Sequence, residues 1–252
     1  EMYRRLGATL EHGINCGEFL AMALPIALVW ALTARTRAQR IALTVPLLLP
    51  CAAILLTYAR TGWIMLAFAL FLLLWYKKKI LLLPAAALGI GALFLLPESI
   101  QARFLSMLDF SNASASGRFV LWGECFALWK EKWLLGIGLG PENFYAAYAP
   151  YATGLLNFQP PHSNMLYLEM FLSTGILGGL LFCGFFFGIF GRLNRAVRAI
   201  PEKHGRWPAQ ALIASLAGAA LGGIPEYIWF YPRILFFWCV LFGMAIAISD
   251  NS

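Results

Sequence analysis

The chain has 252 residues, of which 61% are hydrophobic and only 12% are charged. A soluble domain needs more charged surface than this, so the composition excludes a soluble globule and indicates an all-α polytopic membrane protein. The net charge of +7 falls in short clusters between apolar runs rather than in one patch, and we therefore expect no nucleic-acid partner.

Apolar runs recur from residue 19 to the C-terminus. A helix needs roughly 20 residues to cross a hydrocarbon core of about 30 Å. The expected spans are 19–34, 41–59, 62–76, 80–96, 164–188, 209–224 and 234–249. Residues 1–252 therefore predict a single integral membrane domain with about seven transmembrane helices. Because Glu1 is not an initiator methionine and no signal-peptide pattern follows it, we expect the C-terminal part of a longer chain.

Basic residues mark alternate short loops between these spans. They are Arg35, Arg37 and Arg40 in the first loop, Lys77, Lys78 and Lys79 in the third, and Arg192, Arg195, Arg198, Lys203 and Arg206 in the fifth. The positive-inside rule places these loops in the cytoplasm. The N-terminus and the remaining loops are then extracytoplasmic.

The segment 97–163 interrupts the apolar pattern and forms a long extracytoplasmic loop, the kind of segment that often carries function. A small-residue linker at 109–117 precedes a helix expected over 118–135. The tryptophans and lysines of that helix suit the membrane surface, with simple anchoring as the alternative. The glycines at 136–140 do not form a nucleotide-binding loop, because no strand precedes them. Glycines after a helix commonly cap its C-terminus, so we expect them to end this helix.

Three residues on the extracytoplasmic side are the candidate catalytic groups. Arg60 ends a predicted span, where a guanidinium either snorkels to the headgroups or binds an anion. Arg118 is expected at a helix N-terminus, where it either faces an anion or is an ordinary solvated arginine. His162 follows two prolines, and an imidazole with a pKa of about 6.5 suits a general base. The alternative is a loop histidine satisfied by backbone carbonyls.

Other charged residues could support such a site. Glu169 follows His162 by seven residues, which on one helix would put both on the same face, with Glu169 about two turns inside the membrane. Glu226 is a weaker second acid, and Arg5 and Arg233 add positive charge outside. The extracytoplasmic acids form no metal-binding pattern, so we expect neither a metal nor another cofactor, and arginines would neutralise a departing diphosphate.

Several of these residues occur in an order that resembles the O-antigen ligase and polymerase family. The matching motifs are Arg60-Thr61-Gly62-Trp63, Arg118 with Trp122, residues 136–144, His162 ahead of Tyr167-Leu168-Glu169, and residues 175–178. The N-terminal Arg5-Leu6-Gly7 followed by Asn15 extends the resemblance to nearly the whole chain.

The resemblance implies inverting transfer of a glycan from an undecaprenyl-diphosphate carrier to an acceptor sugar or hydroxyl, without metal or nucleotide. It places the reaction on the outer face of the bacterial cytoplasmic membrane. It assigns Arg60 and Arg118 to the diphosphate and His162 to activation of the acceptor hydroxyl. The implied partners are the lipid-linked glycan donor, a glycan or lipid-linked acceptor, and membrane lipids.

One spacing departs from the family pattern. Eleven residues separate Ser163 from Gly175, more than the family commonly has, and this shifts Glu169 relative to His162. Asn164 would then fill a polar position near the site. The expected substrate-binding residues are Arg5, Asn164, Tyr167, Glu169 and Arg233.

Two other functions compete with glycan transfer. A multi-helix transporter of a small anion or solute could use Glu169 in a permeation path, although no pair of interrupted spans indicates an inverted repeat. A non-catalytic assembly subunit is the third possibility.

Overall fold

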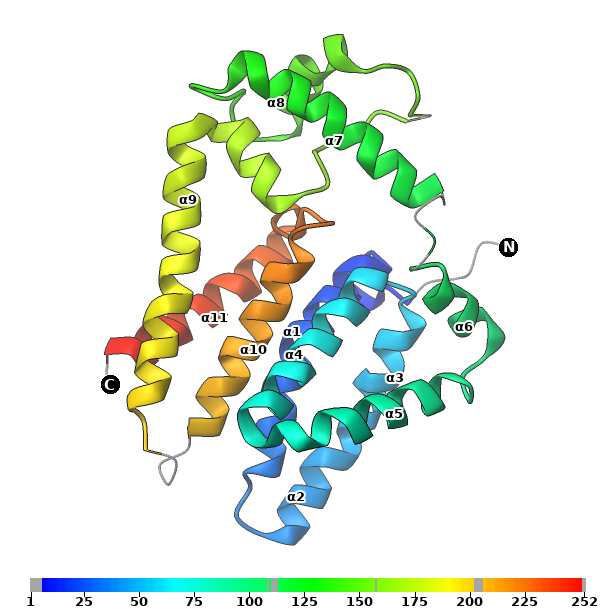
Figure 1. Cartoon of the computed structure of the whole chain (residues 1–252), viewed down its shortest axis with the longest axis vertical. Coiled ribbons are helices and arrows are strands. Elements are labelled where there is room, and N and C mark those ends of the chain that lie inside the picture. Colours follow the sequence, from blue (N-terminus) through cyan, green and yellow to red (C-terminus); the bar gives the residue numbers. More distant parts are fainter. Residues whose placement is uncertain (1–5, 108, 110–112, 157, 202–205, 251–252) are drawn as a thin grey trace. The chain divides into compact units, whose positions relative to one another are not determined.

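A computed structural model of the chain describes residues 6–107, 109, 113–156, 158–201 and 206–250 (Figure 1). The described residues form helices and connecting turns, which confirms the all-α prediction. The chain divides into two compact units. The first unit is Glu1–Met107, Phe190–Gly222 and Tyr231–Ser252, and the second is Leu108–Ile189 and Gly223–Phe230.

Three helices form the core of the first unit: α1 (Gly13–Leu32), α4 (Arg60–Lys78) and α10 (Arg206–Gly222). Small residues allow these helices to approach closely, as is common between helices in membranes. A Cβ on Gly62 would lie 2.8 Å from the carbonyl carbon of Gly17, and one on Gly218 would lie 2.6 Å from the Met65 carbonyl oxygen. Gly62 of the predicted Arg60–Trp63 motif is therefore needed for the crossing of α4 with α1.

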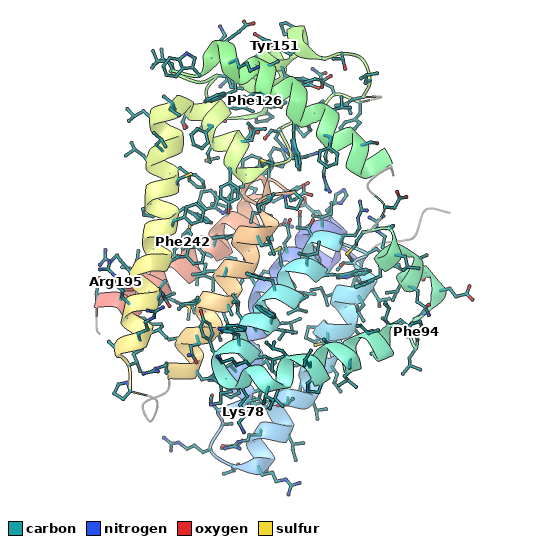
Figure 2. All side chains as sticks on the ribbon, in the orientation of Figure 1. Lys78, Phe94, Phe126, Tyr151, Arg195 and Phe242 are labelled. Carbon is teal, nitrogen blue, oxygen red and sulfur yellow. The ribbon has the colours of Figure 1, made fainter. Side chains whose placement is uncertain are left out.

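The other helices of the first unit are α2 (Arg37–Thr44), α3 (Leu48–Leu56), α5 (Leu82–Leu93), α6 (Glu98–Leu105) and α11 (Pro232–Asp250). Short 3-10 turns lie at Ala8–Leu10, Val45–Leu47 and Lys79–Leu81. Helix α2 starts at a capping box in which the Thr36 hydroxyl and the Gln39 side chain each accept the other's backbone N–H. Lys78 lies at the C-terminal end of α4, where a cation interacts favourably with the helix dipole (Figure 2).

Four helical stretches in the described residues are long and apolar enough to cross a membrane. They are Gly13–Leu32, Arg37–Leu56, Leu166–Ala199 and Pro232–Asp250. These stretches correspond to four of the seven predicted spans, and they make the chain an integral membrane protein. The other three predicted spans coincide with α4, α5 and α10. Of these, the 12 residues of α5 rise about 18 Å, well short of a typical hydrocarbon core.

The second unit contains α7 (Ala113–Lys132), α8 (Pro141–Tyr148) and the first part of α9 (Leu166–Ala199), with 3-10 turns at Ala149–Tyr151 and Ile228–Phe230. Its buried core joins α7, α8 and α9 through Leu121, Cys125, Leu128, Phe144, Tyr148 and Leu172. The side chains of this unit include Phe126 on α7 and Tyr151 in the turn after α8 (Figure 2). Helix α7 starts five residues earlier than predicted, because the small residues before Arg118 continue the helix rather than forming a linker.

Helix α9 is broken at Gly175, where φ is 68° and ψ is −171°, and the chain turns sharply there (Figure 1). The end of α7 and the following glycine turn supply the hydrogen bonds that the break removes. Ile137 N–H donates to the Leu172 carbonyl at 2.8 Å, and Ile176 N–H donates to the Trp133 carbonyl at 2.7 Å. The predicted single fifth span is therefore two helical pieces, of which the one after Gly175 is long enough to cross a membrane.

The glycines at 136–140 end α7, as predicted. Gly136 has φ of 73°, and its N–H donates to the Lys132 carbonyl at 2.8 Å. A Cβ on Gly136 would lie 2.5 Å from the backbone nitrogen of Gly175. The two motif glycines thus allow the turn after α7 to pack directly on the break in α9.

Candidate functional site

The three candidate catalytic residues lie in two units. Arg118 and His162 belong to the second unit, and Arg60 belongs to the first. Among the substrate-binding candidates, Asn164, Tyr167 and Glu169 are in the second unit and Arg233 is in the first, while Arg5 lies outside the described residues.

His162 is buried, with 6% of its surface exposed, in the turn that leads into α9. Its ring packs edge-on against Tyr227 with the ring centroids 5.3 Å apart, and against Phe230 with the centroids 4.4 Å apart. Burial lowers the pKa of His162 to about 4, so the imidazole is neutral at pH 7. A neutral histidine is the form that can either accept or donate a single proton.

The backbone around His162 is held by hydrogen bonds. The Asn164 N–H donates to His162 Nδ1 at 3.1 Å, and Asn164 has φ of 55°, a left-handed conformation that asparagine tolerates better than most residues. Trp122 Nε1 of α7 donates to the Ser163 carbonyl at 3.0 Å. These two contacts hold the N–H and the carbonyl of the Ser163–Asn164 peptide unit.

Glu169 adds another hydrogen bond to the turn that carries His162. Its Oε2 accepts the Ser163 N–H at 2.8 Å, and the residue is 4% exposed. Because α9 begins at Leu166, Glu169 lies in the first turn of the helix, and its depth in the membrane stays a prediction. His162 precedes the helix, so the two residues do not share a helical face. Glu169 instead acts on the turn that carries the histidine.

Arg118 forms an ion pair with Glu226, with Arg118 Nη2 and Glu226 Oε2 2.9 Å apart. The side chains are 24% and 10% exposed, respectively. Burial raises the pKa of Glu226, and the adjacent guanidinium opposes this shift. The prediction that Arg118 lies at the helix N-terminus is wrong, because α7 starts at Ala113 and Arg118 lies in its second turn. Its environment is defined by Glu226 rather than by free backbone amides.

The segment 223–230 joins these features. Glu226 pairs with Arg118, while Tyr227 and Phe230 contact the His162 ring. The Gly223 carbonyl accepts the Leu166 N–H at 2.9 Å and so caps the start of α9. Burial and the negative charge of Glu169 raise the pKa of Tyr227 to about 12. One short segment therefore positions both candidate catalytic residues of the second unit.

Tyr167 lies among aromatic rings of α9. Its ring centroid is 6.0 Å from that of Phe186 and 6.1 Å from that of Phe187, both beyond the break at Gly175. The packing fastens the two pieces of α9 together. A contact of Tyr167 with substrate stays a prediction.

Arg60 is the first residue of α4 in the first unit, and its Nη1 donates to the Ser106 carbonyl at 3.1 Å. The turn before it contains Tyr58 with φ of 51°, and the Tyr58 carbonyl accepts a hydrogen bond from Arg103 Nε at 3.2 Å. Arg60 thus binds the C-terminal end of α6, and Arg103 of α6 binds the turn between α3 and α4. This end of the helix carries a partial positive charge, which adds to the guanidinium.

Arg233, at the start of α11, pairs with Glu11 at 3.0 Å and also donates to the Thr9 carbonyl. It lines a cavity of about 210 Å³ together with Asn15 and Tyr231. Glu18 lies three residues after Asn15 on α1, is fully buried, and was missed by the sequence reasoning. The signal that could have found it is an isolated acid beside an apolar span, since such residues often have a functional role.

A second buried acid, Glu124 on α7, appeared in the sequence only as one of several scattered carboxylates. It accepts hydrogen bonds from the Tyr148 hydroxyl and from the backbone and hydroxyl of Thr153. Although burial raises the pKa of Glu124, the bonds from Thr153 and Tyr148 lower it below its usual value. Glu124 thereby ties α7 to the loop after α8.

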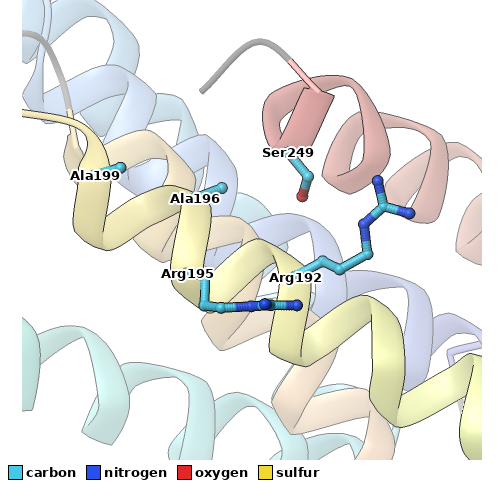
Figure 3. A pocket seen from close by; sticks show the side chains of 5 residues that line it. All are labelled: Arg192, Arg195, Ala196, Ala199 and Ser249. Atoms are coloured by element: carbon cyan, nitrogen blue, oxygen red, sulfur yellow. The ribbon is translucent and has the colours of Figure 1, made fainter.

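A further cavity, of about 290 Å³, lies between the ends of α9 and α11 and is lined by Arg192, Arg195, Ala196, Ala199 and Ser249 (Figure 3). Arg192 pairs there with Asp250 at 2.8 Å, and both side chains are more than half exposed. Its arginines belong to the loop that the sequence predicts to be cytoplasmic. Within the described parts of the chain, no cluster of three His, Cys, Asp or Glu side chains could hold a metal ion.

The membrane-length helices define an integral membrane protein, and comparison with known families identifies its kind. Residues 45–183 match the O-Antigen ligase family, and this stretch is more than half of the chain. The chain therefore belongs to the O-antigen ligase family, which confirms the resemblance drawn from its motifs. Membership implies a glycan ligase or polymerase that acts on lipid-linked glycans. A search of curated proteins finds no match to the chain.

The matched stretch contains Arg60, Arg118, His162 and Glu169, and Glu226 lies outside it. The partner of Arg118 is thus supplied by a part of the chain beyond the family match.

Proposed function

We propose that the protein transfers a glycan from an undecaprenyl-diphosphate carrier to an acceptor sugar or hydroxyl on the extracytoplasmic face of the bacterial cytoplasmic membrane. The observation that carries this proposal is the segment 223–230, which positions both Arg118 and His162 in a chain of the O-antigen ligase family. An arginine for the diphosphate and a neutral histidine for the reacting oxygens are the groups that such a transfer needs.

In this proposal Arg118 and Arg60 bind the diphosphate. A guanidinium presents several N–H groups in one plane and can bind phosphate oxygens bidentately, which an ammonium group cannot do. Glu226 occupies only one Arg118 nitrogen in the observed ion pair. Guanidinium groups, rather than a metal ion, neutralise the charge that develops on the leaving diphosphate.

The supporting roles follow from position. Glu169 holds the turn that carries His162, and Asn164 contacts the imidazole through its backbone. Arg233, Tyr167 and Arg5 remain proposed contacts with the glycan or the lipid-linked substrates. The proposal places the residues 97–163 outside, with seven spans in one membrane domain.

The test is transfer of a glycan by the purified protein in liposomes, with an undecaprenyl-diphosphate-linked donor and a lipid-linked acceptor. We expect His162→Ala and Arg118→Lys each to reduce transfer at least about a hundredfold, the size of a lost catalytic group. Arg192→Lys, at the predicted cytoplasmic cavity, is the matched control and should transfer normally. Full activity of His162→Ala would contradict the proposal, and substrate-dependent flux without bond formation would favour the transporter.

Ligation and polymerisation are distinguished in cells that lack the protein. Loss of long glycan chains would show a polymerase, whereas accumulation of long chains that are not attached to their acceptor would show a ligase.

A further inference from the structure

The hydrogen bond at His162 Nδ1 determines which ring nitrogen carries the proton. The donor is the Asn164 backbone N–H, 3.1 Å from Nδ1. A main-chain amide keeps its hydrogen, so Nδ1 has to offer a lone pair, and a neutral imidazole then carries its single proton on Nε2. No described residue is hydrogen-bonded to Nε2, which leaves this nitrogen for a substrate oxygen.

The surroundings hold the ring and the amide in this relation. The Ser163 carbonyl, which is in the same peptide unit as the Asn164 N–H, accepts a hydrogen bond from Trp122. The Ser163 N–H, in the preceding peptide unit, donates to Glu169, so rotation of either unit would break a contact. Tyr227 and Phe230 pack against the ring. Moving the proton to Nδ1 would set two N–H groups against each other and leave a partly buried amide without its acceptor.

We propose that His162 acts as a hydrogen-bond donor through Nε2–H, toward an oxygen of the departing diphosphate, and not as the general base expected from the sequence. A base at Nε2 would need a lone pair on that nitrogen, and the tautomer that the Asn164 amide requires has a proton there. The inference rests on the proposed function and specifies the role of its central residue.

The bonds and protons balance without a base on the protein. The acceptor oxygen forms a bond to the anomeric carbon while the bond from that carbon to the diphosphate oxygen breaks. The electron pair of the broken bond stays on the diphosphate, whose growing charge is stabilised by Nε2–H and by arginine. The attacking hydroxyl becomes strongly acidic as its oxygen bonds to carbon, and its proton passes to water.

Two further features favour a phosphate oxygen as the acceptor of this hydrogen bond. The segment 223–230 contacts both Arg118 and His162, so both side chains can donate hydrogen bonds to one anion. The imidazole is neutral at pH 7 because burial lowers its pKa to about 4. A neutral imidazole can polarise a reacting oxygen effectively, because it gives a hydrogen bond without giving up its proton.

The tautomer is tested directly by nitrogen NMR of the full chain in lipid nanodiscs, with its histidines labelled with ¹⁵N and assigned by comparison with His162→Gln. We expect Nδ1 of His162 to have a pyridine-type shift and Nε2 a pyrrole-type shift at pH 7. Addition of inorganic diphosphate, used as the probe, should move the Nε2–H resonance and leave Nε2 protonated. A proton on Nδ1, or an Nε2–H resonance that does not respond to diphosphate, would overturn the inference.

Substitutions test the role in transfer. The amide nitrogen of glutamine can take the place of Nε2 and donate, but it cannot act as a base, whereas the shorter asparagine reaches only the place of Nδ1. We expect His162→Gln to retain transfer within about tenfold of the natural protein, and His162→Asn and His162→Ala to lose at least about a hundredfold. Glutamine as inactive as alanine, in a variant that keeps its melting temperature, would overturn the donor role.

Failure of the inference is distinguishable from failure of the proposed function. If the natural protein transfers no glycan, the function is wrong, while the NMR experiment still decides the tautomer. If it transfers glycan with the proton on Nδ1, the function stands and His162 is available as a base.

Discussion

At the scale of single residues, the pairing of Arg118 with Glu226 shows how the site depends on partners far apart in the chain. The sequence singled out Arg118 and treated Glu226 as a secondary acid, since nothing local connects them. In the structure they form a largely buried ion pair. A partly buried arginine without its carboxylate is costly, so Glu226 both neutralises and orients the guanidinium.

Replacing Glu226 by glutamine should weaken use of the lipid-diphosphate donor. A hydrogen bond to a charged group contributes about 1.5–3 kcal/mol, so kcat/KM for the donor should fall about 10- to 100-fold, with Glu226→Asp less affected. Steady-state transfer in liposomes measures this change. Asp250→Asn is the control, because it removes the partner of the exposed Arg192, and exposed pairs contribute little. Equal activity of the Glu226→Gln and Asp250→Asn proteins would argue against a positioning role.

At the scale of elements, the end of α7 packs on the break in α9, where the membrane-length second piece of that helix begins. The hydropathy pattern predicts one apolar helix here, and the positive φ of Gly175 interrupts it. A Cβ on Gly175 would lie 2.2 Å from the Leu134 carbonyl oxygen, so the turn after α7 and the break fit only without a side chain. The first piece of α9, before this break, carries Glu169.

Alanine at Gly175 should therefore destabilise the protein. The conformation of Gly175, with φ of 68° and ψ of −171°, is essentially restricted to glycine and costs another residue about 1–3 kcal/mol. The clash with the Leu134 carbonyl adds to this cost. The measurement is the thermal unfolding temperature in detergent. Gly184→Ala in the same helix is the matched control: a Cβ there meets nothing within 4 Å, and alanine should stabilise the helix slightly. A Gly175→Ala protein that melts at or above the natural temperature would contradict this account.

At the scale of the whole molecule, the distribution of charge predicts the orientation in the membrane. Four stretches have the length and composition of membrane spans, and basic residues lie at alternate connections. Helix α5 is the weakest of the seven predicted spans because of its length. Whether it crosses determines the side on which α6 begins.

Single cysteines introduced into a cysteine-free variant should report this orientation. A membrane-impermeant maleimide should label Ala152→Cys at once in spheroplasts, whose cytoplasmic membrane is intact. It should label Thr36→Cys only after that membrane is permeabilised. If α5 and the preceding 3-10 turn at Lys79–Leu81 together cross the membrane, the reagent should label Glu98→Cys from outside. Labelling of Glu98→Cys only from the cytoplasm would remove one crossing from the predicted seven.

The sequence by itself determined the class of protein, the all-α fold and the family. These properties are carried locally: apolar runs have to match the hydrocarbon thickness, and the family motifs keep their order along the chain. The same local signals identified His162, Arg60 and Arg118 as candidates. They also located the glycines that end α7, because a positive φ favours glycine.

Only the tertiary structure decided what surrounds those candidates. The ion pair of Arg118 with Glu226 and the aromatic contacts of His162 join segments that are distant in sequence, so no pattern of spacing predicts them. The start of α9 at Leu166 changed the relation of Glu169 to His162, because helix boundaries depend on capping contacts such as that from Gly223. The proton position on His162 depends on one backbone hydrogen bond, which exists because Asn164 adopts a left-handed conformation within a packed turn.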